Sequence, residues 1–340
     1  MKAIKEMKKN EHAVSPIVAT LVLIVVAVVG AVAVGTIMGA FSGDVGDQMS
    51  SGDVSSAAQT EILISGSTTV QPASTNLAKE YMKDNGGIKV NVQGGGSDAG
   101  LAAINLKVVD IGMASKIADA VKYPDLVGHE IGGSAVVWIA NGISGTVTLN
   151  DLKYAYTNTT AGTGAVTTPQ NNITSGTIMF QRSEGSGTEE TAADFLSMTG
   201  KTFDGTSAAK KEGNAGVLQA VQSTTGSIGF VDYGFAVDLA TTNAKVQILG
   251  VDANGDGDVD GHIAVAKDAS ASTLKTNILN ALKGTATFPT EGSKYLTRPL
   301  VYYTNGAPSG IIKNFIDFAR SPVGIKPIED SGAFHVISYS

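Results

Sequence analysis

The stretch QRSEGSGT, residues 181–188, lies between an apolar segment at 177–180 that is typical of a strand and a segment at 189–198 that is typical of a helix. A loop rich in glycine and hydroxyls in front of a helix presents backbone N–H groups at the positive end of the helix dipole, where anions bind. Arg182 adds a planar fork of donors that suits a tetrahedral oxyanion. The stretch therefore predicts a strand, an anion-binding loop and a helix.

The same arrangement occurs twice more, nearer the N-terminus. Residues 61–64 are typical of a strand and are followed by the loop GSTTVQP and a helical pattern at 73–83. Residues 88–92 alternate as a strand and are followed by the loop QGGGSD and a helical pattern at 99–106. A single loop of this kind is usually only a helix cap. Three of them in one chain favour an α/β protein that binds an anion.

The composition of the 340-residue chain excludes several classes of protein. Hydrophobic residues make up 43% and charged residues 16%, which is incompatible with wholesale disorder. The net charge of −7 argues against nucleic-acid binding, which needs a basic surface. Because the chain has no cysteine, it has no disulfide, no thiol nucleophile and no thiolate metal site.

Charge is distributed unevenly along the chain. Residues 1–12 form a leader with four lysines and two glutamates, whereas residues 13–41 carry no charge. The apolar run at 17–40 would form a helix of roughly 36 Å, enough to cross a bilayer. We therefore expect one transmembrane helix with its N-terminus inside and the acidic body outside. Residues 42–60 are rich in Gly, Ser, Asp and Gln and predict a flexible linker.

Small residues recur four apart along the apolar run, at Ala27, Ala31, Gly35 and Gly39. This spacing allows close helix–helix approach and self-assembly, although chance explains it equally well in a segment so rich in Ala and Gly. The segment 12–17, basic before and apolar after, resembles the start of archaeal type IV pilins. That resemblance implies cleavage near Ala13 and a helix that stays on and packs into a filament core.

Several stretches of the body match one family, namely residues 66–72, 94–97, 109–116, 182–188 and 226–231, and 298–300 through 315–318. On these stretches the body resembles the phosphate-binding proteins that serve ABC importers, over most of residues 60–340. The resemblance implies a periplasmic-binding-protein-like α/β fold with two lobes and a hinge, lobe 1 at about 61–140 and 305–340 and lobe 2 at about 141–304. It also implies extracytoplasmic capture of inorganic phosphate, or a similar tetrahedral oxyanion, for the permease of an ABC importer, with no metal.

The resemblance also assigns binding residues. From the first lobe these are Thr68, Thr69, the backbone N–H of Val70, and Ser97; from the second they are Arg182, Ser186, Gly187 and Thr188. Many relatives carry an aspartate that accepts a proton from phosphate near the position of Lys116. Either Lys116 faces the anion, which would tolerate a fully ionised oxyanion such as sulfate, or it is a solvated lysine outside the cleft.

A second set of oxygen ligands has the spacing of a calcium loop: Asp252, Asn254, Asp256, Asp258 and Asp260. The glutamate expected at the twelfth position is Ile263, so the segment is either a structural calcium site completed by other ligands or a polar hairpin tip. Asn158 and Asn172 fit the glycosylation acceptor pattern in a stretch that is typical of an exposed loop.

The sequence contains no constellation that is typical of an enzyme, because nothing supplies an activated nucleophile or a pair of metals. Two functions remain. The first is a membrane-tethered binding protein with an extracellular body that delivers phosphate to an importer. The second is a pilin-like subunit of a surface filament whose head has this fold. In both, Trp138 is expected in a core strand near the crossover between the lobes.

Overall fold

The computed structural model describes residues 60–143, 146–157, 173–174, 176–237, 245–252, 271–284 and 296–336. Contacts divide the chain into Met1–Ala58 and Gln59–Ser340, and all described residues belong to the second unit. The predicted leader, the apolar helix with its stripe of small residues, and nearly all of the linker lie outside the described residues. Among the residues that are described, no helix is long and apolar enough to cross a membrane.

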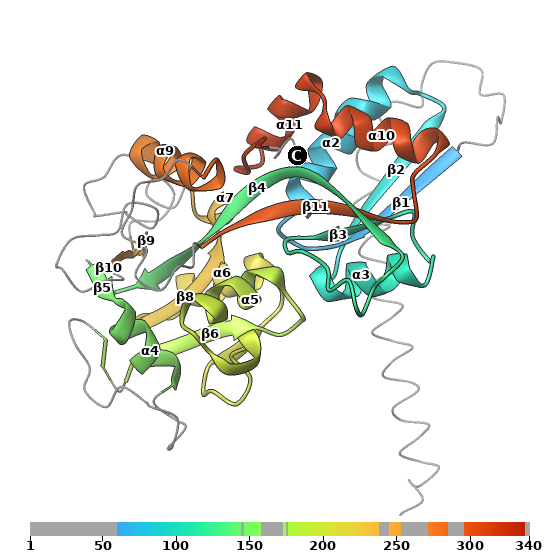
Figure 1. The fold of residues 1–340 in the computed structure, drawn as a ribbon. Helices are drawn as coiled ribbons and strands as arrows, with labels where there is room; N and C mark the ends of the chain where they lie inside the picture. Colours follow the sequence, from blue (N-terminus) through green and yellow to red (C-terminus); the bar gives the residue numbers. More distant parts are fainter. Residues whose placement is uncertain are drawn as a thin grey trace, which may run out of the picture. The chain divides into compact units, whose positions relative to one another are not determined.

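Nine strands of the described part form one mixed sheet with two parallel groups (Figure 1). β1, β2 and β3 are parallel to one another, and so are β6, β7 and β8. The long strands β4 and β11 pair antiparallel between these groups, and β9 joins the edge of β4. The order is β2 (Ile88–Gly94), β1 (Thr60–Gly66), β3 (Ile111–Ala114), β11 (Thr297–Asn305), β4 (Leu126–Asn141), β8 (Ser227–Asp232), β6 (Ile178–Arg182) and β7 (Ala209–Lys211), with β9 (Val246–Ile248) off this path.

Some of the described helices connect strands within the two parallel groups, and others lie elsewhere in the chain order. The described helices are α2 (Gln71–Asp84), α3 (Ser97–Asn105), α4 (Leu149–Thr157), α5 (Gly187–Phe195), α6 (Gly213–Ser223), α7 (Tyr233–Ala236), α9 (Ala271–Leu282), α10 (Gly310–Arg320) and α11 (Ile325–Glu329), with the 3₁₀ turns η1 (Thr199–Lys201) and η2 (Pro322–Gly324). The strands β5 (Thr146–Thr148) and β10 (Gly250–Asp252) form a separate parallel pair. The three predicted strand–loop–helix units are confirmed as β1–α2, β2–α3 and β6–α5.

The helix α5 begins and ends earlier than the pattern at 189–198 predicts. It begins at Gly187 because Ser186 caps it, accepting hydrogen bonds from the backbone N–H groups of the next residues. It ends at Phe195, and Ser197 beyond it has φ +57°, a left-handed conformation that cannot continue the helix.

The strand β4 contributes alternate residues to two cores. Ala135, Val137 and Ile139 face one cluster, and Val136 and Trp138 face the other, as the two-residue period of a strand requires. Trp138 is fully buried, so its expected place in a core strand is confirmed. Its ring packs against the rings of Tyr156, Phe203 and Phe230.

A further core lies beside β1 and α2. Ile62 and Leu77 pack there with Leu300 and Tyr302 of β11 and with Phe315 of α10. The C-terminal elements therefore return to the first parallel group, since β11 pairs with β3. The limits of the two lobes stay a prediction. Leu300 and Tyr302 already share this core, although they precede residue 305, where the chain is predicted to return to lobe 1.

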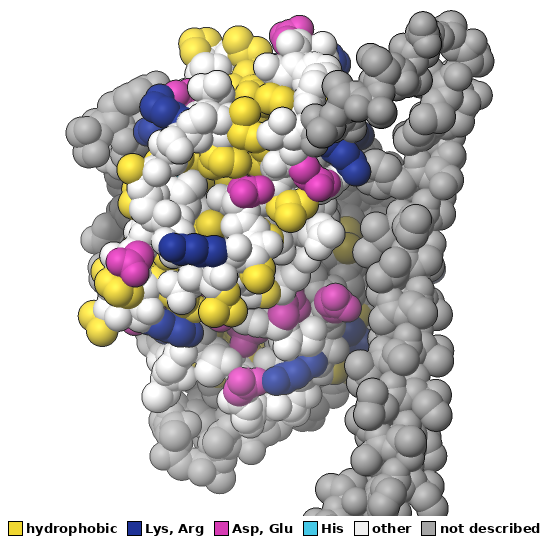
Figure 2. Space-filling view, turned by 90° about the vertical axis from the view of Figure 1, so that its right-hand side faces the viewer, with side chains coloured by type: hydrophobic (Ala, Val, Ile, Leu, Met, Phe, Trp, Pro, Cys, Tyr) yellow, Lys and Arg dark blue, Asp and Glu magenta, His cyan; other side chains and the backbone are white. Residues whose placement is uncertain are grey.

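One face of the molecule shows basic and acidic side chains interspersed with apolar ones (Figure 2). On the described part of that face, the lysines and arginines do not gather into a stripe. Several large apolar side chains are exposed among the described residues, with Val121 92% exposed. Scattered exposed apolar residues of this kind are normal for a protein surface.

Candidate functional site

Two loops that are far apart in the sequence meet through adjacent threonines. Thr68 and Thr69 lie between β1 and α2, and Arg182 ends β6. Arg182 Nη2 donates to Thr68 Oγ1 at 2.7 Å. The hydroxyls of Thr69 and Thr188 are 3.1 Å apart. The structure thus brings together the two loops that the sequence singles out, across the two parallel groups of the sheet.

Arg182 is the central cation of this meeting point. Its side chain is 1% exposed. Its Nε donates to Glu184 Oε1 at 2.9 Å, its Nη2 also bonds that oxygen, and its Nη1 donates to Asn214 Oδ1 at 3.1 Å. Burial lowers the pKa of Arg182, and the neighbouring carboxylate of Glu184 opposes that effect. Because an arginine stays protonated under such a shift, the guanidinium remains a positive charge held in a fixed orientation.

A group of serines continues the network from Thr69. The Thr69 N–H donates to Ser67 Oγ at 3.2 Å, and the Ser67 hydroxyl donates to Ser115 Oγ at 3.1 Å. Ser97 Oγ lies 3.3 Å from Ser115 Oγ and accepts the backbone N–H of Gly187 at 3.3 Å. One hydrogen-bonded path therefore runs from the first loop to the N-terminus of α5.

The N-terminus of α5 approaches β3 so closely that only glycine fits at position 187. A Cβ on Gly187 would lie 2.4 Å from the Ser115 carbonyl oxygen, which is closer than any atom tolerates. Ser186 Oγ accepts the backbone N–H of Thr188 at 3.1 Å and that of Glu189 at 3.5 Å. The helix end is thus capped and positioned beside the hydroxyl cluster, with its positive dipole end toward it.

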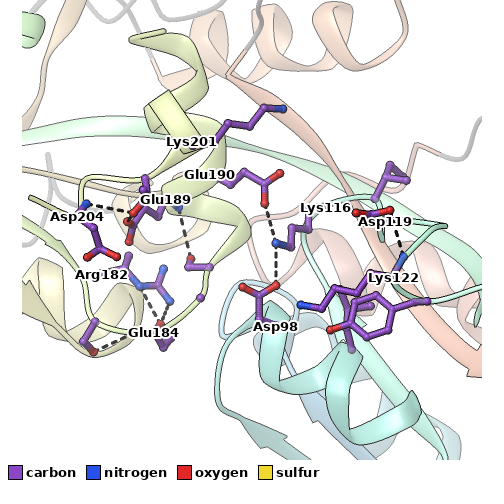
Figure 3. Close-up of a pocket in the computed structure, with 18 of the residues that line it drawn as sticks. Asp98, Lys116, Asp119, Lys122, Arg182, Glu184, Glu189, Glu190, Lys201 and Asp204 are labelled. Atoms are coloured by element: carbon purple, nitrogen blue, oxygen red, sulfur yellow. Dashed lines mark hydrogen bonds and ion pairs between the residues drawn. The ribbon is translucent and has the colours of Figure 1, made fainter. Parts of the chain in front are cut away.

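A cavity of about 490 Å³ adjoins the cluster and is lined by charged groups of both signs, including Asp98, Lys116, Arg182 and Glu190 (Figure 3). Lys116 Nζ lies 2.8 Å from Asp98 Oδ1 and 2.7 Å from Glu190 Oε2. Burial alone would lower the pKa of Lys116, but its hydrogen bonds to these two carboxylates outweigh burial and raise the pKa. Lys116 therefore lines the cavity as a paired cation.

The remaining predicted residues take other places. Val70 is buried, and its N–H donates to the Ser67 carbonyl oxygen at 3.2 Å within the turn before α2. Ser186 acts as the cap of α5. Thr68, Thr69, Arg182 and Thr188 meet directly, and Ser97 joins Gly187. The assignment of all nine residues to an anion stays a prediction.

Sequence reasoning missed residues that lie behind the threonines. Asn214 Nδ2 and Arg298 Nη2 both donate to Thr69 Oγ1, at 3.0 and 3.1 Å. Arg298 Nη2 also donates to Asp232 Oδ2 at 2.8 Å. Arg298 begins one of the stretches that carry the family resemblance and Asp232 directly follows another, a signal that could have drawn attention to them. Asn214 is the second residue of α6 and offers no such signal.

The other predicted sites fall mostly outside the described residues. Asp252 ends β10 and is buried, whereas the other four residues of the calcium loop lie outside the described part. No group of three metal-binding side chains occurs within the described ranges. Asn158 and Asn172 also lie outside them.

A family model described as the PBP superfamily domain matches residues 51–323, more than half of the chain. The chain belongs to the PBP superfamily. The matched range includes every loop and side chain of the cluster described above, from Ser67 to Arg298. The α/β architecture with its mixed sheet confirms the predicted periplasmic-binding-protein-like α/β fold.

Individual relatives of this PBP-superfamily chain are distant. The phosphate-binding protein PstS of Bacillus subtilis is 22% identical over 265 residues, which cover 76% of this chain and 75% of the relative. A structure from Clostridium perfringens, of a protein assigned as a phosphate ABC transporter substrate-binding protein with bound phosphate, has a TM-score of 0.59 at 20% identity. It covers 82% of this chain and 100% of that one. An ABC-type phosphate transport receptor from Vibrio cholerae has a TM-score of 0.55 at 21% identity and covers 80% and 99%.

Proposed function

We propose that this chain binds inorganic phosphate, or a similar tetrahedral oxyanion, outside the cytoplasm and delivers it to an ABC importer without catalysing a reaction. The observation that carries the proposal is the convergence of Arg182, Thr68, Thr69 and Thr188 from two separate loops onto one buried point. The distant relatives named for phosphate binding and transport support the same ligand class.

The energetics of such a site are sufficient. A hydrogen bond to a charged group contributes about 1.5–3 kcal/mol. A micromolar site needs about 8 kcal/mol. About three to five such hydrogen bonds therefore suffice, and Arg182, Thr68, Thr69 and Thr188 are the groups inferred to donate them. The acidic surface does not prevent binding, because exposed carboxylates beyond roughly 10 Å are screened by salt.

Binding is inferred to close two lobes around the anion. The two lobes correspond to the parallel groups of the sheet, and β4 and β11, which pass between them, are the inferred hinge. The apolar run at 13–41 is inferred to tether the body to the cell membrane, with the body outside. The permease of the importer is then the partner that receives the anion.

A calorimetric titration tests the proposal. The full chain, purified in a mild detergent, is titrated with phosphate and with sulfate, and nitrate serves as the planar control. Phosphate is expected to bind with micromolar or better affinity and nitrate is not. Comparable affinity for sulfate would mean that the site accepts a fully ionised oxyanion. Lys116 suggests this result, because it stands near the position where many relatives carry an aspartate that accepts a proton from phosphate. Neither heat nor a shift in melting temperature at millimolar phosphate and sulfate would contradict the function.

A structural calcium ion in the loop that begins at Asp252 remains part of the proposal. Bound calcium should raise the melting temperature of the full chain by mass action, and Asp256→Asn with Asp258→Asn should abolish that rise. Identical melting in chelator and in millimolar calcium would argue against the ion.

A further inference from the structure

Arg298 is a second buried cation beside the anion site. It lies in β11, opposite Ser134 of β4, and is 4% exposed. Its Nη2 donates to Asp232 Oδ2 at 2.8 Å and to Thr69 Oγ1 at 3.1 Å, while its Nε and Nη1 have no hydrogen-bond partner among the described residues. A buried guanidinium with unsatisfied donors is costly to maintain. Its contact with a loop of the anion site suggests what it does.

The hydrogen bonds at Thr69 fix the direction of its proton. A threonine hydroxyl has one hydrogen to donate and two lone pairs that accept. Arg298 Nη2 and Asn214 Nδ2 both donate to Thr69 Oγ1, so both lone pairs are occupied. The hydroxyl hydrogen can then point only away from them, toward Thr188 Oγ1 at 3.1 Å.

The orientation of Asn214 is fixed as well. Its Oδ1 accepts from Arg182 Nη1 at 3.1 Å and from the backbone N–H of Asp232 at 3.0 Å. Two donors facing one oxygen exclude the flipped amide, so Nδ2 must face Thr69. Asp232 holds Arg298 from the other side and also accepts the Ser134 hydroxyl at 2.7 Å. Every partner that aims a donor at Thr69 is therefore itself held in place.

We propose that Arg298 is a positioning residue of the anion site, which together with Asn214 makes the Thr69 hydroxyl an obligatory donor. The inference rests on the proposed function and adds a specificity to it. An oxyanion oxygen without a proton that replaces Thr188 Oγ1 as the partner of Thr69 accepts that hydrogen, whereas a ligand that must donate at this point finds no acceptor. Arg298 thereby acts through Thr69 and not by touching the anion.

A double-mutant cycle separates this role from a purely structural one. Phosphate affinity of the full chain is measured for Arg298→Gln, for Thr69→Val and for the double variant. Arg298→Gln is expected to weaken binding about tenfold in the native background, the size of one hydrogen bond. In the Thr69→Val background it should weaken binding by less than twofold, because the group that it orients is gone.

Two further variants sharpen the cycle. Arg320→Ala removes an arginine whose Nε bonds the Glu130 carbonyl oxygen, and it should leave affinity unchanged. Arg298→Lys should restore part of the affinity because it retains a donor. If Arg298→Gln folds poorly, the double variant Asp232→Asn with Arg298→Gln takes its place in the cycle, because removing both charges keeps the buried site neutral.

The outcomes are distinct. Equal losses of affinity in both backgrounds, or a lower melting temperature with native affinity, would overturn the role of Arg298.

If the native chain binds neither phosphate nor sulfate, the proposed function fails, and the same cycle is scored on melting temperature. Arg298→Gln should then lower the melting temperature less in the Thr69→Val background than in the native one, and additive effects would overturn the pairing.

Discussion

At the scale of single residues, Arg182 combines two tasks that usually conflict. Under the proposed function it must present donors to an anion, yet its guanidinium is almost fully buried and bonded to Glu184, Asn214 and Thr68. The carboxylate of Glu184 balances its charge when no anion is bound and leaves the fork in a fixed plane. Arg182 is thus prepared for an oxyanion at no further cost in side-chain entropy.

We predict that Arg182→Ala lowers phosphate affinity roughly 30-fold or more, because truncating one partner of a buried charge pair costs about 2–5 kcal/mol. It should also lower the melting temperature, since Glu184 loses its cation. Arg182→Lys should restore most of the stability but only part of the affinity, because an ammonium lacks the planar fork. Calorimetry and thermal melting of both variants, with Arg320→Ala as the matched control, check this. Native affinity in Arg182→Ala would refute the role.

Lys116 gives a prediction about alkaline stability. Its pKa is raised in the folded protein above its ordinary value of 10.5. A raised lysine pKa contributes stability that is present below the ordinary pKa and is lost as pH rises through the folded value. The native chain should therefore lose stability more steeply above pH 10.5 than Lys116→Met does.

Thermal melting between about pH 8 and pH 12 measures the difference, which should be a few degrees because the partly exposed pair is screened by solvent. Lys83→Met, in an exposed pair with Glu80, is the matched control and should behave like the native chain. Parallel curves for Lys116→Met and the native chain would contradict the prediction.

The candidate site shows which residues a sequence can reveal. Thr68, Thr69, Arg182 and Thr188 lie in or next to loops whose glycines and hydroxyls are visible as a local pattern, and the structure brings these four together. Asn214 and Arg298 reach Thr69 from 145 and 229 residues away in the chain. No local pattern encodes such contacts, because they depend on the order of the strands.

At the scale of elements, the N-terminus of α5 is placed by the absence of a side chain. Gly187 allows the helix to rest against the Ser115 carbonyl oxygen, and its N–H then reaches Ser97 Oγ. The strand–loop–helix units were predictable because periodicity and glycine-rich loops are local signals. The early end of α5 was not, because Ser197 adopts its left-handed conformation without a glycine to signal it.

We predict that Gly187→Ala weakens phosphate binding about tenfold, since overpacking costs about 1–3 kcal/mol and would push α5 away from β3. Gly216→Ala in α6 is the matched control, because a Cβ there meets its nearest atom at an ordinary 3.7 Å. That variant should retain affinity and gain slight stability. Calorimetry decides, and equal affinities for the two variants would contradict the role of Gly187.

At the scale of the whole body, the two parallel groups of the sheet touch through polar contacts at the site. Thr69 meets Thr188, Ser97 meets Gly187, and Lys116 joins Glu190. Each contact is weak when water competes for it. An anion can bond Arg182 and the hydroxyls at once only when the two groups are in contact, which is the closed arrangement. Such an anion would stabilise the closed arrangement and would therefore shift the population toward it.

The absence of cysteine in the chain makes this closure measurable, because two introduced cysteines take spin labels at chosen positions only. Val121 and Ala209 are both exposed; Val121 follows β3 of one parallel group in the chain, and Ala209 begins β7 of the other. In the double variant Val121→Cys with Ala209→Cys, phosphate should shorten and narrow the distance distribution between the labels. The same pair combined with Arg182→Ala should show the unliganded distribution at phosphate concentrations that saturate the parent. A distribution unchanged by phosphate in the parent, with binding intact by calorimetry, would mean that the anion enters without closure and that β4 and β11 do not act as a hinge.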